Sequence, residues 1–313
     1  MRLLRLCLLL LACVLVPVPS WSAMRIGVLP AADSLALYVA SEEQLFARHG
    51  LEISIVPFQS AMEQAAAVRA GALEGYFGDI MNVLLMHESG VPQEIVATTS
   101  YSGGMPDDSY GPGSRYFGIA VAPGSPHTTI GDMAGTDIAI GRATIVDYML
   151  DSMLESQALP SDHVNHLDIR QIPLRMQLLL NGKIDGAVLP EPLLSLVEAQ
   201  GARVILDNRR LSMPLAVVAL NKEQALPETV RAFQAALAEA MGLINADPDT
   251  YKAMMLTKKL LPQGAVETYT MLRFDPVHTP LPLPSLQAIE HVADWMVRGK
   301  MLRTPPKPGA VLP

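Results

Sequence analysis

The chain has 313 residues, of which 50% are hydrophobic and 17% are charged, enough for one large or two modest cores. A formal net charge of −8 and a pI near 5.4 argue against nucleic-acid binding. Aromatic residues make up only 5% of the chain, which argues against a site that stacks bases or sugars.

The first 22 residues have the pattern of a secretory signal peptide. Arg2 and Arg5 give a basic start, an apolar run of about 11 residues follows, and small residues precede a predicted cleavage after Ser22. The apolar run is too short to span a bilayer comfortably. We therefore expect an exported, periplasmic protein.

Lipid anchoring is an alternative at the N-terminus. Leu10 to Cys13 form a loose lipobox, which would attach a lipid to Cys13. Both cysteines of the chain, Cys7 and Cys13, precede Ala23. The exported chain is therefore expected to contain no disulfide, thiol nucleophile or zinc–thiolate site.

From Met24 onward, short apolar runs alternate with helical stretches. Such alternation predicts βαβ units, an α/β fold and mainly parallel sheets. The predicted strands cover 24–30, 51–58, 73–78, 94–100, 136–141, 166–172, 184–190, 202–207 and 213–221. The predicted helices cover 34–49, 62–70, 80–87, 144–157, 174–181, 192–200, 227–246, 248–260, 264–272 and 285–298.

Two such units followed by a helical segment predict two lobes. Two extended apolar stretches, Tyr116 to Gly124 and Arg210 to Leu220, are expected to act as hinge strands between them. The predicted organisation is a signal peptide in 1–22, a first lobe in 23–120 and 214–303, a second lobe in 121–213, and a proline-rich, poorly ordered tail in 304–313.

Several stretches resemble one group of binding proteins. They are "LFARHGLEISI" at 45–55, "GALEG" at 71–75, "TTIGDMAGTDIAIG" at the start of 128–159, and "LLLNGKIDGAVLPEP" at the start of 178–207. Together they are similar to the solute-binding proteins of the nitrate/sulfonate/taurine and thiamine-precursor family, which serve ABC importers. The resemblance covers most of the chain after the signal peptide.

The resemblance implies a type II periplasmic-binding-protein fold, whose two lobes close on a small ligand. It also implies a partner, the ABC permease of the inner membrane with its ATPase. We expect a monomer that binds a small molecule, without a cofactor, a metal or nucleic acid. No catalytic residue is expected.

The candidate ligand-binding residues follow the predicted strands, because ligands of open α/β sheets lie beyond the carboxyl ends of the strands. They are Pro30, Asp33, Ser34, Ser60, Gly78, Asp79, Asn82, Ser100, Tyr101, Gly141, Arg142, Ala143, Thr144, Pro190 and Glu191.

Most of these residues have a structural alternative. Asp33, Ser34 and Asp79 are also suited to cap the next helix, and Ser60 with Glu63 fits a capping box. Asp79 is the favoured ligand contact of the first lobe. Glu191, between two prolines, is expected to face the first lobe and accept hydrogen bonds; the alternative is a stiff turn with the carboxylate near a helix dipole.

The turn at Gly141 to Thr144 precedes a predicted helix, so its free N–H groups favour an anion. Arg142 could hold a carboxylate or sulfonate there, or simply be solvated. Asp79 and Glu191 instead favour a hydrogen-bond donor such as an aminopyrimidine. A zwitterion would satisfy both sets, and the ligand stays open.

Solute capture for an ABC importer is the leading hypothesis. An enzyme on the same fold is a second, but the related pyrimidine synthases carry a cysteine-rich motif that a chain starting at Ala23 lacks. A ligand sensor for a signalling partner is a third. His163 and His166 give only a weak metal signal, and a surface position is the favoured explanation.

Overall fold

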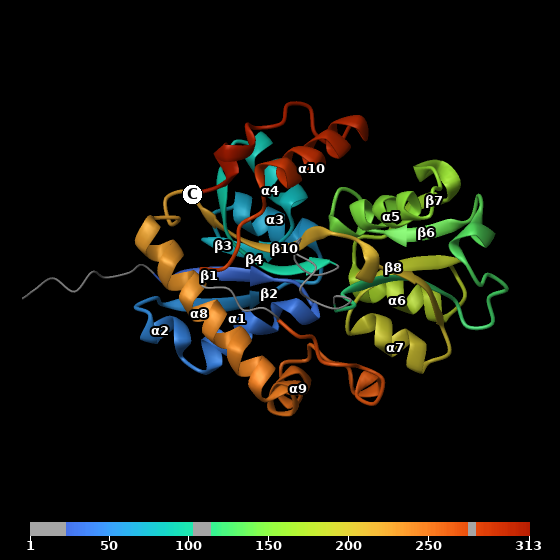
Figure 1. The fold of residues 1–313 in the computed structure, drawn as a ribbon, viewed down its shortest axis with the longest axis horizontal. Coiled ribbons are helices and arrows are strands. Elements are labelled where there is room, and N and C mark those ends of the chain that lie inside the picture. The colour runs from blue at the N-terminus through green and yellow to red at the C-terminus, as the bar shows by residue number, and fades with distance from the viewer. Residues whose placement is uncertain (1–22, 103–113, 275–279) are drawn as a thin grey trace, which may run out of the picture.

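The computed structural model describes residues 23–102, 114–274 and 280–313 (Figure 1). The predicted signal peptide and lipobox lie outside these residues. The described chain forms two lobes, each built on a five-stranded sheet flanked by helices. Among the described residues, no helix has both the length and the hydropathy that a membrane span requires.

The first lobe contains a sheet with the strand order β2-β1-β3-β10-β4. Its strands are β1 (Met24–Val28), β2 (Ile53–Pro57), β3 (Gly75–Gly78), β4 (Gln93–Ser102) and β10 (Met213–Asn221). β1 runs parallel to β2 and β3, whereas β10 runs antiparallel to β3 and β4. The last strand of the sheet in sequence thus lies between two early ones.

The second lobe contains a sheet with the strand order β7-β6-β8-β5-β9. Its strands are β5 (Phe117–Val121), β6 (Asp137–Ile140), β7 (Asn165–Asp168), β8 (Gly186–Pro190) and β9 (Arg203–Asp207). β6 is parallel to β7 and β8, and β5 is antiparallel to β8 and β9. Both sheets are therefore mixed, because β5 and β10 enter their sheets directly after a crossing between the lobes.

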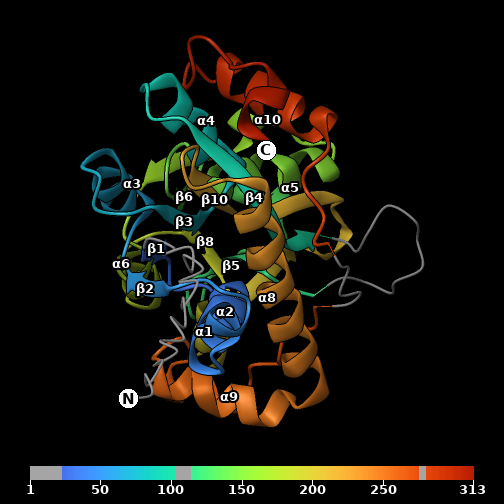
Figure 2. The same ribbon diagram turned by 90° about the vertical axis from the view of Figure 1, so that its left-hand side faces the viewer.

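Helices cover both faces of the first sheet (Figure 2). One face carries α1, α2 and α8, and the other carries α3, α4 and α10. Since both faces are covered, β10 is an almost continuous apolar run whose side chains alternate between the two cores. The helices are α1 (Leu35–Glu42), α2 (Leu45–Arg48), α3 (Ala61–Arg69), α4 (Ile80–Glu88), α8 (Pro227–Ala246), α9 (Pro248–Thr257) and α10 (Leu286–Arg298).

Three helices belong to the second lobe. They are α5 (Ile145–Ser156), α6 (Ile172–Leu180) and α7 (Leu193–Ala199). Short 3-10 helices complete the fold at Ala32–Ser34, Ile130–Met133, Ser161–His163, Asn208–Arg210, Gln263–Ala265 and Pro308–Val311.

The crossings between the lobes lie close together around Asn208, which is fully buried. Its side chain accepts hydrogen bonds from the N–H groups of Tyr116 and Phe117 at 2.8 and 2.9 Å, and its backbone carbonyl accepts one from Ser102 Oγ. The whole of β5 lies in the second sheet, so the second lobe starts before Phe117, whereas the predicted boundary placed residues 117–120 in the first lobe.

One predicted helix is wrong. Residues 264–272 contain only a 3-10 turn and irregular structure. The apolar residues Ala265, Tyr269 and Leu272 are buried and have helical spacing, which explains the prediction. The backbone is held differently, because Lys252 Nζ donates to the carbonyl of Tyr269 at 2.8 Å, and Thr268 Oγ1 donates to the carbonyl of Ser195 in the second lobe at 3.0 Å.

The predicted poorly ordered tail is also wrong. Residues 304–313 end in a 3-10 turn whose Val311 is fully buried in the core that α4 and α10 share. The carboxylate of Glu88, at the end of α4, accepts the backbone N–H groups of Arg303 and Thr304 at 2.7 and 3.2 Å. The burial of Val311 and the hydrogen bonds to Glu88 thus hold residues 304–313 against the first lobe, although the proline content of this segment predicts poor order.

Replacing Val311 with aspartate is expected to lower the free energy of unfolding by about 2 kcal/mol or more, because an apolar contact is lost and a charge is buried. Urea denaturation measures the difference. Ala310→Asp, at an exposed neighbouring position, is the matched control and should change stability by less than about 0.5 kcal/mol. Equal effects of the two variants would contradict the packed tail.

Candidate functional site

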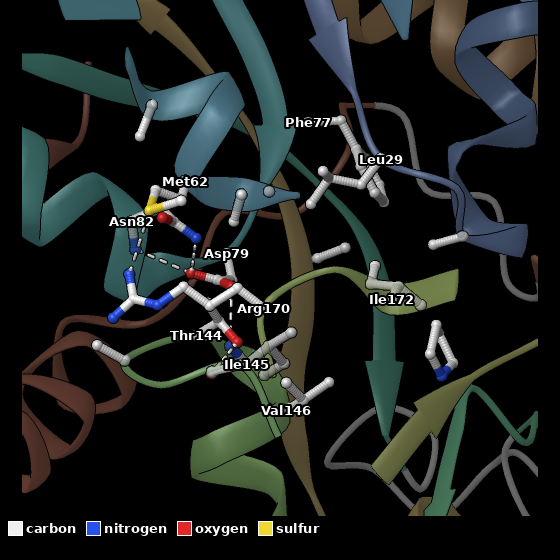
Figure 3. A pocket seen from close by; sticks show the side chains of 18 of the residues that line it. Leu29, Met62, Phe77, Asp79, Asn82, Thr144, Ile145, Val146, Arg170 and Ile172 are labelled. Atoms are coloured by element: carbon white, nitrogen blue, oxygen red, sulfur yellow. Dashed lines mark hydrogen bonds between the residues drawn. The ribbon is translucent and has the colours of Figure 1, made fainter. Parts of the chain in front are cut away.

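A cavity of about 340 Å³ lies between the lobes, next to the carboxyl ends of several strands (Figure 3). Its volume falls in the range of small-molecule sites. Most of the lining is apolar. It includes Leu29, Met62 and Phe77 from the first lobe and Phe117, Val146 and Ile172 from the second.

Asp79 joins the two lobes at the edge of this cavity. It is 2% exposed and caps α4, with Oδ1 accepting from the backbone N–H and the side-chain amide of Asn82, both at 2.8 Å. Its Oδ2 accepts the backbone N–H of Ile145, at the start of α5 in the other lobe, also at 2.8 Å. Figure 3 shows the carboxylate between these two partners. Burial raises the pKa of Asp79, and the hydrogen bonds from Asn82 and Ile145 oppose this shift.

The turn before α5 is already occupied by carboxylates of the protein. The N–H of Arg142 donates to Asp168, that of Ala143 to Asp147, both at 2.9 Å, and that of Ile145 to Asp79. The hydroxyl of Thr144 donates to the carbonyl of Gly141 at 2.7 Å. Gly141, Arg142, Ala143 and Thr144 line the cavity, as expected, but these donors are engaged within the chain.

Ala143 adopts a left-handed conformation, with φ of +58°. This region is unfavourable for an alanine, so neighbouring contacts must stabilise it. The hydrogen bond from its N–H to the buried carboxylate of Asp147 provides one such contact. Asp147 therefore stabilises the conformation of the turn from the protein interior. It does not line the cavity.

Arg175 lines the cavity and was not among the predicted residues. It is 1% exposed and lies on α6 between the buried residues Ile172 and Leu179. A single arginine on the buried stripe of an apolar helix is the signal that sequence reasoning missed. Burial lowers the pKa of Arg175 to about 10, although the charge of Asp168 opposes this.

Three further arginines lie at more exposed parts of the lining. Arg142, 43% exposed, is 3.8 Å from Asp147, and Arg170, 45% exposed, pairs with Asp168 at 2.9 Å. Arg170 also crosses to the first lobe, where its Nη1 lies 3.7 Å from Met62 Sδ. Arg69 completes the set. The lining thus combines four arginines with the two aspartates Asp33 and Asp79.

Asp33 is a buried carboxylate in the wall of the cavity. Ser100 Oγ donates to its Oδ2 at 2.5 Å and accepts the N–H of Ala216 at 3.2 Å. Ser100 therefore positions Asp33 and does not line the cavity itself. Burial raises the pKa of Asp33 to about 6, and the hydrogen bond from Ser100 limits the increase.

Glu191 is placed differently from the prediction. Its side chain does not line the cavity; Oε1 accepts from Arg115 Nε at 2.7 Å and Oε2 from the N–H of Ser195 at 3.1 Å. Arg115 also pairs with Glu198 at 2.6 Å. The backbone carbonyl of Glu191 contacts the first lobe, where it accepts the N–H of Ala32 at 2.9 Å. The alternative of a stiff turn near a helix start therefore describes Glu191 better.

Other predicted residues divide in the same way. Gly78, Asn82 and Pro190 line the cavity, whereas Pro30, Ser34, Ser60 and Tyr101 do not. The hydroxyl of Ser34 donates to the carbonyl of Ala31, and Ser60 caps α3 by accepting the N–H of Glu63. The hydroxyl of Tyr101 lies 3.5 Å from the carbonyl of Leu283.

A further contact between the lobes joins α5 and α10. Trp295 Nε1 on α10 donates to Asp151 Oδ2 on α5 at 2.7 Å, and the ring of Tyr148 packs edge-on against Trp295. His166 lies between Asp147 and Asp151, at 2.8 and 3.4 Å. Burial lowers the pKa of His166, but its contacts with both carboxylates outweigh this and raise it overall. His166 thus belongs to a half-buried ion-pair network and not to the surface.

Groups of three or more histidine, cysteine, aspartate or glutamate side chains that could hold a metal are absent from the parts of the chain that the structure describes. The polar groups that line the cavity are guanidinium groups, carboxylates, backbone amides, the side-chain amide of Asn82 and the hydroxyl of Thr144.

Comparisons with known proteins agree with this fold. Residues 113–251 match the family described as NMT1/THI5 like. A search of curated proteins finds no match. Among solved structures, the chain is similar to the alkanesulfonate-binding protein SsuA from Xanthomonas axonopodis pv. citri bound to MOPS, with 20% identity, a TM-score of 0.74, and coverage of 93% of this chain and 97% of the other.

Two other structures show the same likeness. The periplasmic aliphatic sulphonate binding protein SsuA from Escherichia coli has 18% identity, a TM-score of 0.73, and coverage of 93% of this chain and 91% of the other. The periplasmic nitrate-binding protein NrtA from Synechocystis PCC 6803 has 12% identity, a TM-score of 0.63, and coverage of 81% and 72%.

The fold is therefore that of the periplasmic binding proteins, as the sequence predicts. The predicted resemblance to the nitrate- and sulfonate-binding group is confirmed by the NMT1/THI5-like match and by these structural neighbours.

Replacing Asp33 with asparagine should change how stability depends on pH. The pKa of Asp33 is higher in the folded chain, at about 6, than its ordinary value of 3.8, so the wild type binds this proton more strongly when folded and loses stability as the pH rises from 4 to 7. Asp33→Asn should remove that loss, which is about 2 kcal/mol between these pH values. Urea denaturation at pH 4, 5.5 and 7 measures it.

The expected sign is specific. The stability difference, Asp33→Asn minus wild type, should increase from pH 4 to pH 7. Asp249→Asn, at an exposed position in α9, is the control and should show no such trend. A difference that stays constant with pH would contradict the buried, ionisable Asp33.

Proposed function

We propose that the chain is the solute-binding component of an ABC importer in the periplasm, which encloses a small solute between its lobes and delivers it to the permease. The observation that carries this proposal is the cavity between the lobes, to which each lobe contributes apolar side chains and charged groups. A site divided between two lobes is complete only when they are closed, so binding and closure are coupled.

The contacts across the cleft combine apolar packing, such as that of Tyr148 against Trp295, with hydrogen bonds. The hydrogen bonds include those from Ile145 N–H to Asp79, from Ala32 N–H to the carbonyl of Glu191, and from Trp295 to Asp151. Hydrogen bonds of this kind contribute about 0.5–1.5 kcal/mol each, or more where one group is charged. The contribution of these hydrogen bonds is of the same size as that of a few solute contacts, so a solute that binds both lobes favours the closed form.

Delivery requires a partner that distinguishes the closed form from the open one. The neighbours named above include periplasmic sulfonate- and nitrate-binding proteins, which supports a periplasmic location and a transport role for this chain. The permease with its ATPase and a monomeric state belong to the same proposal.

The proposal predicts that the chain from Ala23 onward binds at least one class of small solute. The test is a thermal-shift screen against sulfonates, nitrate, carboxylates, amino acids, pyrimidines and flavins. A solute at about one hundred times its dissociation constant should add about 2.7 kcal/mol to the free energy of unfolding. Failure of every class to raise the melting temperature would contradict solute capture.

Replacing Asp79 with alanine should favour the open form, because it removes the bond to Ile145 and leaves the start of α5 without its carboxylate. The loss of the α4 cap should also cost about 0.5–2 kcal/mol of stability. Small-angle scattering should show a larger radius of gyration. Trp295 is the only tryptophan after the signal peptide, so its emission should shift to the red as the lobes separate.

Asp162→Ala is the matched control, since Asp162 is exposed and lies outside the cleft. It should leave both the scattering profile and the emission of Trp295 unchanged. Identical profiles for Asp79→Ala and the wild type would show that Asp79 does not hold the lobes together.

A further inference from the structure

Arg175 is a buried cation that no carboxylate contacts directly in the described residues, although the charge of Asp168 acts on it from a longer distance. No ion pair within residues 23–102, 114–274 and 280–313 includes it, and its Nε is buried without a hydrogen-bond acceptor. Its Nη1 makes only a long bond, 3.4 Å, to the carbonyl of Ile169. A buried charge in this state destabilises the folded chain unless another group compensates it.

The backbone leaves room for this guanidinium. A Cβ added to Gly141 would lie 3.2 Å from Arg175 Nη1, so glycine at the end of β6 lets the arginine approach the turn closely. The guanidinium therefore reaches the cavity wall beside the turn that precedes α5. The other lining arginines are more exposed, and Arg142 and Arg170 lie close to aspartates.

The shape of the available donors favours one anionic group over others. The backbone N–H groups of Arg142, Ala143 and Ile145, which could surround a tetrahedral anion, already bind carboxylates of the protein. Arg175 offers a planar guanidinium, which matches a planar carboxylate. A sulfonate has a third oxygen outside the plane of the guanidinium, which would need a second donor elsewhere in the lining.

The rest of the lining favours an apolar body on the solute. Ile172 and Val146 lie near Arg175 in the second lobe, and Leu29, Phe77 and Leu215 face them from the first. Building on the proposed function, we propose that the solute is an organic carboxylate with a largely apolar body, and that Arg175 binds its carboxylate group.

The test uses the chain from Ala23 onward and isothermal titration calorimetry. The probes are benzoate and hexanoate, with benzenesulfonate, benzamide and benzylamine as analogues that change the head group. The carboxylates should bind at least tenfold more tightly than these analogues. In Arg175→Met, carboxylate affinity should fall about thirtyfold or more, because a charge-assisted bond is lost.

A stability measurement separates binding from a structural role. If Arg175 serves the solute, Arg175→Met removes an uncompensated buried charge and should melt without solute at the same temperature as the wild type or higher. Arg231→Gln, at an exposed position on α8, controls for the loss of one positive charge and should change neither affinity nor melting temperature.

Several outcomes would overturn the assignment. One is tighter binding of the sulfonate, amide or amine than of the carboxylates, which would leave solute capture intact. Another is a large loss of affinity in Arg142→Gln with none in Arg175→Met, which would place the anion at the turn. Destabilisation of Arg175→Met with unchanged affinity would show a structural arginine. If no solute of any class binds, the proposed function itself fails.

Discussion

One buried carboxylate, that of Asp79, links the two lobes at the cavity. The carboxylate accepts the backbone N–H of Asn82 in the first turn of α4, its own helix. It also accepts the backbone N–H of Ile145, the first residue of α5 in the other lobe. Two helix N-termini, both partly positive, thus share a single buried negative charge. This shared carboxylate fixes the distance between the lobes at the cavity. It also explains why the N–H group at the start of α5 needs no external anion as its hydrogen-bond acceptor.

Much of the fold could be predicted because its elements are locally specified. The alternation of apolar strands and capped helices can be recognised in the sequence. For example, α8 begins at Pro227 and ends at Ala246, as predicted. The errors arise where distant contacts decide. Thr268 bonds to the second lobe and Glu88 holds the tail, and neither partner can be recognised from spacing along the chain.

The candidate site could be located but not resolved from sequence. Strand ends gave Asp33, Asp79 and the turn at Gly141, because the carboxyl ends of strands converge in this class of fold. The sequence could not show that Glu191 forms an ion pair with Arg115, because 76 residues separate the two in the chain. Arg175 lies within a helix and does not directly follow a strand in the sequence, so only the structure shows that it lines the cavity beside the end of β6.

The position of β10 has a consequence for the order in which the molecule is assembled. The second sheet comes from one continuous segment between Phe117 and Asp207, whereas the first sheet needs β10 between β3 and β4. A chain that emerges N-terminus first can therefore complete its second lobe while its first remains without a central strand. The cleft needs both lobes, so a nascent or truncated chain without β10 lacks a site in which to retain a solute.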